Sequence, residues 1–180
     1  MNQSITSRLK ARLFKFYTKR LIKARQATYA HVGFDQAQSI GILYSGDSAQ
    51  KQEVVQQLAT QLKQQGKRVT MLRYVEDSKQ VTNWSTPTVT RRDIRFGGEI
   101  AYSEAKIFVD TPFDYLYHVD WDGHSVLDYL LAKSKAKCRV GHYVAARAGL
   151  FEIMVSLAKQ PDSRELTDLT AQMLHYTQLL

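Results

Sequence analysis

Apolar and polar positions along this chain predict helices and strands in turn. Residues 4–26 contain no Gly or Pro and are rich in Leu, Lys, Arg and Ala, which favours one long helix with Ser4 or Ser7 as its N-cap. At about 100° per residue, one face of this helix is apolar and the neighbouring stripe is basic. The apolar face is predicted to hold Ile5, Leu9, Leu13, Phe16 and Tyr17.

The rest of the chain places short apolar runs between helical patterns. Apolar residues between 54 and 62 recur at spacings of three and four and predict a helix that ends at Gly66. A closing helix follows Ser163, its predicted N-cap, and another covers residues 126–133. The predicted strands are residues 40–44, 69–75, 113–119, 137–142 and 150–157, with 86–92 as a candidate edge strand and 106–109 as a further apolar segment.

Strands that alternate with helices call for a mainly parallel sheet, because parallel strands need a crossover connection. The length of 180 residues suits one such domain with an appendage. We therefore expect an α/β protein with a small, open, Rossmann-like sheet, helices on both of its faces, and a basic amphipathic helix in front. The predicted division is an N-terminal helical arm and joint over residues 1–34 and an α/β domain over residues 35–180.

The net charge of +8 is concentrated in the predicted arm. Residues 1–34 contain eight of the 25 Lys and Arg residues and no Asp or Glu. The other 17 basic residues equal the 17 acidic residues in number, so the rest of the chain is electrically balanced.

The single cysteine, Cys138, excludes an internal disulfide and indicates a reducing compartment. The longest apolar runs are well short of the ~20 residues that a transmembrane helix needs. These two features predict a cytoplasmic protein, and Cys138 on its strand is expected to be buried rather than reactive.

The basic stripe of the arm is the first candidate site, because Lys and Arg neutralise the phosphates of nucleic acids. Phe16, Tyr17 and Arg20 could add stacking on bases. Two alternatives remain open: the apolar face docks on the body and the charges are merely solvated, or the helix lies on an anionic membrane. The predicted nucleic-acid contacts are Arg8, Arg12, Lys15, Lys19, Arg20 and Lys23.

Two predicted strand-to-helix turns form the second candidate site, because ligands of open α/β sheets bind at the carboxyl edge of the strands. Hydroxyls and helix N-termini in these turns could hold a phosphate. Neither turn has dinucleotide or P-loop spacing, and helix capping explains the same residue types. The candidate ligand contacts are Ser45, Asp47, Ser48, Asp120, Asp122, His124 and Ser125.

Chemical motifs beyond these turns are weak. His118, Asp120, Asp122 and His124 alternate, but the turn at Gly123 separates the last of them from the others, so we expect no metal site. No nucleophile elbow, Cys-x-x-Cys or Walker sequence occurs, and no catalytic residue or cofactor is predicted.

The segment Phe113-Asp114-Tyr115-Leu116-Tyr117, the helix over residues 126–132 and the stretch from Ser134 to Gly141 together resemble the DUF6913 family, short α/β proteins of Bacteroidota that begin with a Lys-rich helix. The resemblance implies a bacterial cytoplasmic setting and brings no function or catalytic residue with it.

The sequence thus favours a non-enzymatic binding protein whose basic helix engages RNA, on or near ribosomes. The alternatives are a small enzyme or sensor that binds a phosphorylated metabolite at the sheet edge, and peripheral binding to an anionic membrane. The sequence leaves the oligomeric state open.

Overall fold

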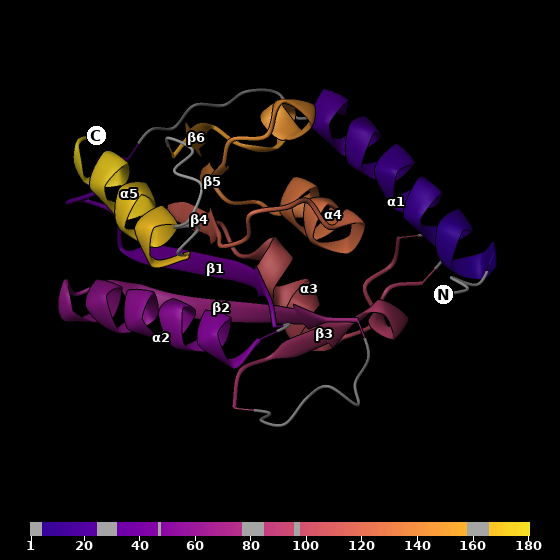
Figure 1. Cartoon of the computed structure of the whole chain (residues 1–180), viewed down its shortest axis with the longest axis horizontal. Helices are drawn as coiled ribbons and strands as arrows, with labels where there is room; N and C mark the ends of the chain where they lie inside the picture. Colours follow the sequence, from indigo (N-terminus) through magenta and orange to yellow (C-terminus); the bar gives the residue numbers. More distant parts are fainter. Residues whose placement is uncertain (1–4, 25–31, 47, 77–84, 96–97, 158–165) are drawn as a thin grey trace.

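The computed structural model describes residues 5–24, 32–46, 48–76, 85–95, 98–157 and 166–180, with side chains from residue 11 onwards (Figure 1). Helices and strands alternate along most of this chain. In chain order the elements are α1 (Ile5–Ala24), β1 (Ser39–Ser45), α2 (Ala49–Gln64), β2 (Arg68–Val75), β3 (Thr88–Thr90), the 3₁₀ turn η2 (Arg91–Asp93), α3 (Ser103–Asp110), β4 (Tyr115–His118), α4 (Ser125–Lys133), β5 (Cys138–His142), the 3₁₀ turn η3 (Ala145–Leu150), β6 (Ile153–Val155) and α5 (Leu166–Gln178).

The strands form one six-stranded sheet in the order β3-β2-β1-β4-β5-β6, and every pairing is parallel. The predicted Rossmann-like fold is confirmed. The strand order reverses between β1 and β4, where crossovers leave in opposite directions. In open α/β sheets, a crevice for ligands forms at this point, outside the carboxyl ends of the strands.

Helices cover both faces of the sheet, as expected (Figure 1). On one face, α2 and α5 pack on side chains that include Ile42, Tyr117 and Val140. On the other face, α3 and α4 pack on side chains that include Leu43, Leu72 and Leu116. The two faces therefore share strands whose side chains point alternately to either side, which explains why the strands read as nearly continuous apolar runs.

Local signals in the sequence place the ends of α2. Ser48 is its N-cap, since the Ser48 hydroxyl accepts a hydrogen bond of 3.1 Å from the Lys51 amide. After the helix, Gly66 has φ +78°, a left-handed conformation that glycine adopts without steric penalty. The Gly66 amide donates to the Lys63 carbonyl, which ends the helix as the sequence predicted.

Two expectations about the elements change. The segment 106–109 lies within helix α3, because its run of three apolar residues, 107–109, fits a short helix as well as it fits a strand. The strand expected over residues 150–157 is limited to Ile153–Val155, since residues 145–150 form η3. The predicted caps Ser4 and Ser163 lie outside the described residues, and so does the side chain of Ser7.

Helix α1 docks on the body through an apolar face that packs mainly against α4. Phe14 is 2% exposed, and its ring centroid lies 5.5 Å from that of Tyr129 on α4. Tyr17, Leu21 and Ile22 pack against the same core.

The predicted orientation of this helix is wrong for Phe16, which is 61% exposed on the opposite side. The apolar surface of the body selects the face centred on Phe14, whereas the periodicity alone allows either aromatic to face inward. Leu13 is half-buried, and the side chains of Ile5 and Leu9 lie outside the described residues.

The two phenylalanines of α1 provide a matched test of this docking. Phe14→Ala should lower the free energy of unfolding by about 3–5 kcal/mol, as expected for a buried aromatic ring. Phe16→Ala should change it by no more than about 0.5 kcal/mol, because its ring is largely in solvent. Urea denaturation of the full chain measures both values, and equal effects of the two substitutions would contradict the docked arrangement.

Candidate functional site

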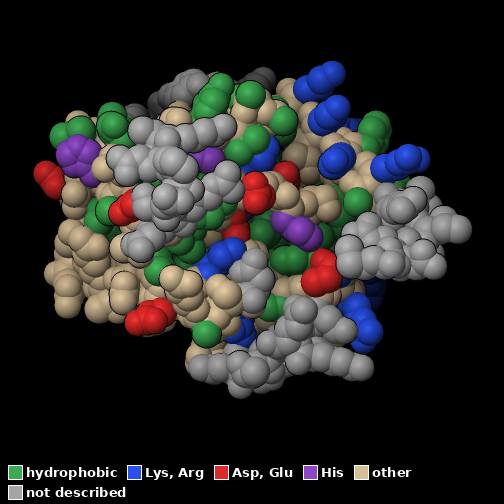
Figure 2. Space-filling model, in the orientation of Figure 1, with side chains coloured by type: hydrophobic (Ala, Val, Ile, Leu, Met, Phe, Trp, Pro, Cys, Tyr) green, Lys and Arg blue, Asp and Glu red, His purple; other side chains and the backbone are tan. Residues whose placement is uncertain are grey.

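The outward face of α1 carries a row of cations (Figure 2). Their spacing of three and four residues places them on the side of the helix that also exposes Phe16. Within the described part of the chain, none of them forms an ion pair with a carboxylate. This outward cationic face consists of Arg12, Lys15, Lys19, Arg20 and Lys23, all of them exposed. The predicted contact Arg8 lies in α1, and its side chain is outside the described residues.

The carboxyl ends of β1 and β4 are joined by Asp120, a carboxylate only 4% exposed. Its Oδ2 atom accepts a hydrogen bond of 2.8 Å from the Ser45 amide, and its Oδ1 atom accepts one from the Ser45 hydroxyl. The Lys51 ammonium, on the first turn of α2, lies 2.7 Å from the same Oδ1 atom. The two predicted turns therefore meet, as the parallel sheet requires, but Ser45 and Asp120 bond to each other and to Lys51.

A second buried polar group lies beside Asp120. His118 is fully buried, and its Nε2 atom lies 3.4 Å from Nη2 of Arg147 and 3.9 Å from Oδ2 of Asp120. Arg147 in turn donates to Asp128 on α4 at 2.7 Å. Burial lowers the pKa of His118 to about 3, so the imidazole is neutral at physiological pH.

The remaining residues that were predicted to bind a ligand do not lie together. Ser48 caps α2 and lines a small cavity of about 190 Å³ together with Lys51 and Trp121. Asp122 is exposed, and Asp47 lies outside the described residues. Among the side chains that the structure describes, no three His, Cys, Asp or Glu residues lie close enough together to bind a metal ion.

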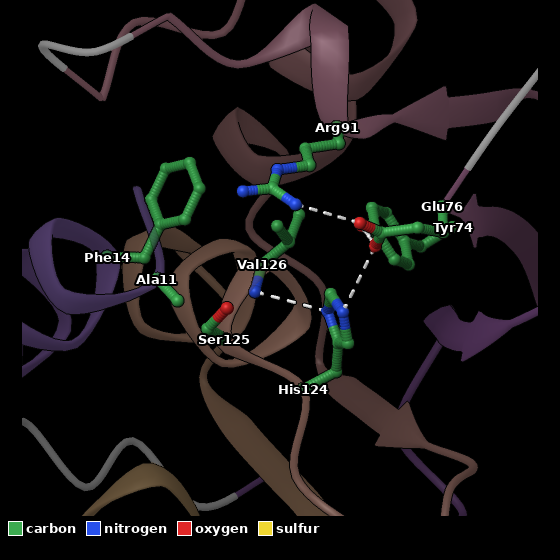
Figure 3. A pocket seen from close by; sticks show the side chains of 8 residues that line it. All are labelled: Ala11, Phe14, Tyr74, Glu76, Arg91, His124, Ser125 and Val126. Carbon is green, nitrogen blue, oxygen red and sulfur yellow. Dashed lines mark hydrogen bonds and ion pairs between the residues drawn. The ribbon is translucent and has the colours of Figure 1, made fainter. Parts of the chain in front are cut away.

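His124 and Ser125 line a larger cavity, of about 400 Å³, at the carboxyl edge of β2 (Figure 3). The first turn of α4 forms one wall, the end of β2 and the turn η2 form another, and α1 forms the roof. The lining residues are Ala11, Phe14, Tyr74, Glu76, Arg91, His124, Ser125 and Val126.

Glu76 is the centre of the polar wall of this cavity (Figure 3). Its Oε2 atom accepts a hydrogen bond of 2.6 Å from the Tyr74 hydroxyl, and its Oε1 atom accepts one of 3.0 Å from Nη1 of Arg91. Nε2 of His124 lies 3.5 Å from Oε2, and the rings of His124 and Tyr74 are 4.6 Å apart. Three segments far apart in the sequence thus converge on one carboxylate.

The protonation states of Glu76 and His124 follow from their surroundings. Burial would raise the pKa of Glu76, but the hydrogen bonds from Tyr74 and Arg91 outweigh it and lower that pKa below its usual value. Burial lowers the pKa of His124, and Glu76 opposes that change only in part. At neutral pH the cavity therefore presents an anionic Glu76, a cationic Arg91 and a neutral His124.

Comparison with known proteins assigns the chain to a group. A family described as one of unknown function, DUF6913, matches residues 10–180. The chain belongs to the DUF6913 family. No curated protein and no solved structure matches this DUF6913 chain. No helix in the described part of the DUF6913 protein is long and apolar enough to cross a bilayer.

Residue patterns in this DUF6913 protein predicted some of the cavity and missed its centre. Glu76 directly follows β2, and Arg91 lies in the segment 86–92 that was expected as a candidate edge strand; neither was among the predicted site residues. The available signal was position: Glu76 is the first residue after a strand of a parallel sheet, and such residues lie at the carboxyl edge.

The buried His118 predicts how the stability of the DUF6913 protein depends on pH. Its pKa is about 3 when folded, whereas an unperturbed histidine has a pKa of about 6.5. The unfolded chain therefore binds more protons between these values, so stability is full above pH 6.5 and falls as the pH decreases. Between about pH 6.5 and 4.5 the free energy of unfolding should fall by about 2 kcal/mol from this group.

Urea denaturation across this pH range measures the effect. His118→Gln should flatten the dependence, and His175→Gln, on the exposed face of α5, is the matched control. Proton NMR of the His118 imidazole in the folded wild-type protein provides a second measurement. Titration of that ring near pH 6.5 would contradict its buried, neutral state.

Proposed function

We propose that this protein is a non-enzymatic binding protein whose N-terminal helix engages RNA, on or near ribosomes. The observation that carries the proposal is the outward cationic face of α1, which is exposed and has no carboxylate partner among the described side chains. Cations left unpaired in this way are available to replace the counterions of a phosphate backbone.

The distribution of charge over the whole chain supports a specific role for this face. The chain outside residues 1–34 has 17 basic and 17 acidic residues, so solubility alone does not require a separate cationic helix. Phe16 stands among the cations with most of its ring exposed, and its centroid lies 5.9 Å from that of Tyr17. An exposed ring between phosphate contacts can stack on an unpaired base of single-stranded RNA.

The docking of α1 favours RNA over a membrane. A helix that binds in the plane of a bilayer inserts its apolar face among the lipids. In this protein the face that contains Phe14, Leu21 and Ile22 is packed against the body. The cations remain accessible while the apolar face is occupied, an arrangement that suits a polyanion in solution.

The proposed setting is the cytoplasm of a bacterium, where ribosomal RNA is abundant. The lone Cys138, which is buried, fits a reducing compartment. The resemblance to proteins of Bacteroidota points to the same setting.

A second candidate function is the binding of a phosphorylated metabolite at the carboxyl edge of the sheet. The cavity lined by Glu76, Arg91 and Ser125 favours it. The two functions do not compete, since this cavity lies beneath the inner face of α1 and the cations lie on the outer face.

Salt dependence tests RNA binding most directly. For single-stranded RNA, each phosphate contact contributes about 0.7 to the slope of log K against log salt concentration, so five contacts predict a slope of about −3.5. The double variant Lys19→Gln/Lys23→Gln should make this slope shallower by about 1.4. Filter binding of a single-stranded oligoribonucleotide by the full chain measures both slopes.

The matched control is Lys63→Gln/Lys106→Gln, which removes the same charge from exposed positions on α2 and α3. An equal effect of the two double variants would mean that only net charge matters and would contradict a site on α1. Flotation with phosphatidylserine vesicles at the same ionic strength tests the membrane alternative. Stronger retention on vesicles than on RNA would overturn the proposal.

A further inference from the structure

The size and lining of the cavity under α1 limit the kinds of ligand that it can bind. Its volume of about 400 Å³ falls in the range of about 300–1,000 Å³ that is typical of small-molecule sites. A phosphate ion alone would leave most of this space empty. The ligand therefore has a body of its own in addition to any charged group.

One end of the cavity is built to accept hydrogen bonds. Both oxygens of Glu76 are held in place, one by the Tyr74 hydroxyl and the other by Arg91, yet about half of the Glu76 side chain remains exposed (51%). The imidazole of His124, which is 40% exposed, packs with one face toward Tyr74. A flat group that donates hydrogen bonds fits this end, because it can bond to the Glu76 carboxylate and stack on the exposed part of the imidazole.

The opposite end favours an anion. The Ser125 hydroxyl, on the first turn of α4, points into the space between Arg91 and Phe14 (Figure 3), whereas the Val126 amide already donates to Nδ1 of His124. The positive end of the α4 dipole lies beside this hydroxyl and favours a negative charge there.

We propose that this cavity is a nucleotide site, with the base against Glu76 and His124 and the phosphate toward the first turn of α4. The inference rests on the second candidate function and narrows the phosphorylated metabolite to a mononucleotide. A nucleobase supplies the flat, hydrogen-bond-donating group, and its 5′-phosphate supplies the anion. The nucleotide is either free or a residue of the RNA that α1 binds, since both present the same groups.

The test is a thermal-shift titration of the full chain with AMP, GMP, CMP and UMP, and in parallel with inorganic phosphate and ribose 5-phosphate. At a concentration 100 times its Kd, a bound nucleotide should raise the Tm by about 5–10 °C. At least one nucleotide should bind more tightly than ribose 5-phosphate by about tenfold or more, since a base that bonds to a carboxylate adds that much affinity.

Ala11→Trp fills the cavity from its roof and should abolish the nucleotide shift. Ala24→Trp, the same change at an exposed position near the end of α1, is the matched control and should leave the shift intact. Glu76→Gln keeps the size of the side chain and removes its charge. Glu76→Gln should weaken the binding of the preferred nucleotide by about ten- to a hundredfold. This second variant keeps the test decisive if Ala11→Trp does not fold.

The outcomes separate the nucleotide inference from the function on which it rests. Equal binding of ribose 5-phosphate and every nucleotide would overturn the inference and leave the metabolite function standing. The absence of any shift would overturn both. If Ala11→Trp weakens nucleotide and RNA binding alike, the occupant is a residue of the RNA, and if it weakens only nucleotide binding, the occupant is free nucleotide. Either result supports the site.

Discussion

The hydrogen bonds of Asp120 join the two central strands at the point where the order of the sheet reverses. A buried carboxylate needs partners, and this one receives the amide and hydroxyl of Ser45 and the ammonium of Lys51. Asp114 makes a similar connection at the amino ends of the same strands, where it accepts bonds from the Ser39 amide and hydroxyl and from Lys137. β1 and β4 are therefore held together at both ends, and Lys51 connects the first turn of α2 to the carboxyl end of this pair.

The position of α4 on the sheet determines how α1 docks. Because α4 packs on the sheet, the Tyr129 ring forms an aromatic surface, and Phe14 packs against it. This contact determines which face of α1 points toward the body and which points toward solvent. The inner face closes the cavity above Glu76, and the outer face displays the cations and Phe16. One packing contact thus creates both candidate sites, which lie on opposite sides of a single helix.

The two sites differ in their electrostatics. On α1 the charges have one sign and stand in solvent, where they suit a long polyanion and respond strongly to salt. In the cavity, Glu76 and Arg91 neutralise each other while His124 stays uncharged, so recognition there depends on the placement of hydrogen bonds and on shape. A small ligand with two chemically different ends matches the second environment.

The sequence by itself determined the alternation of strands and helices that requires a parallel sheet, the end of α2 at Gly66 and the segregation of positive charge, because each depends on residues that are neighbours along the chain. Only the tertiary structure decided which face of α1 is buried, that segment 106–109 is helical, and that Glu76, Arg91 and His124 meet. Those outcomes depend on contacts between segments that are distant in sequence. Local periodicity carries no information about such contacts, since an amphipathic helix with two aromatic residues fits a core in more than one orientation.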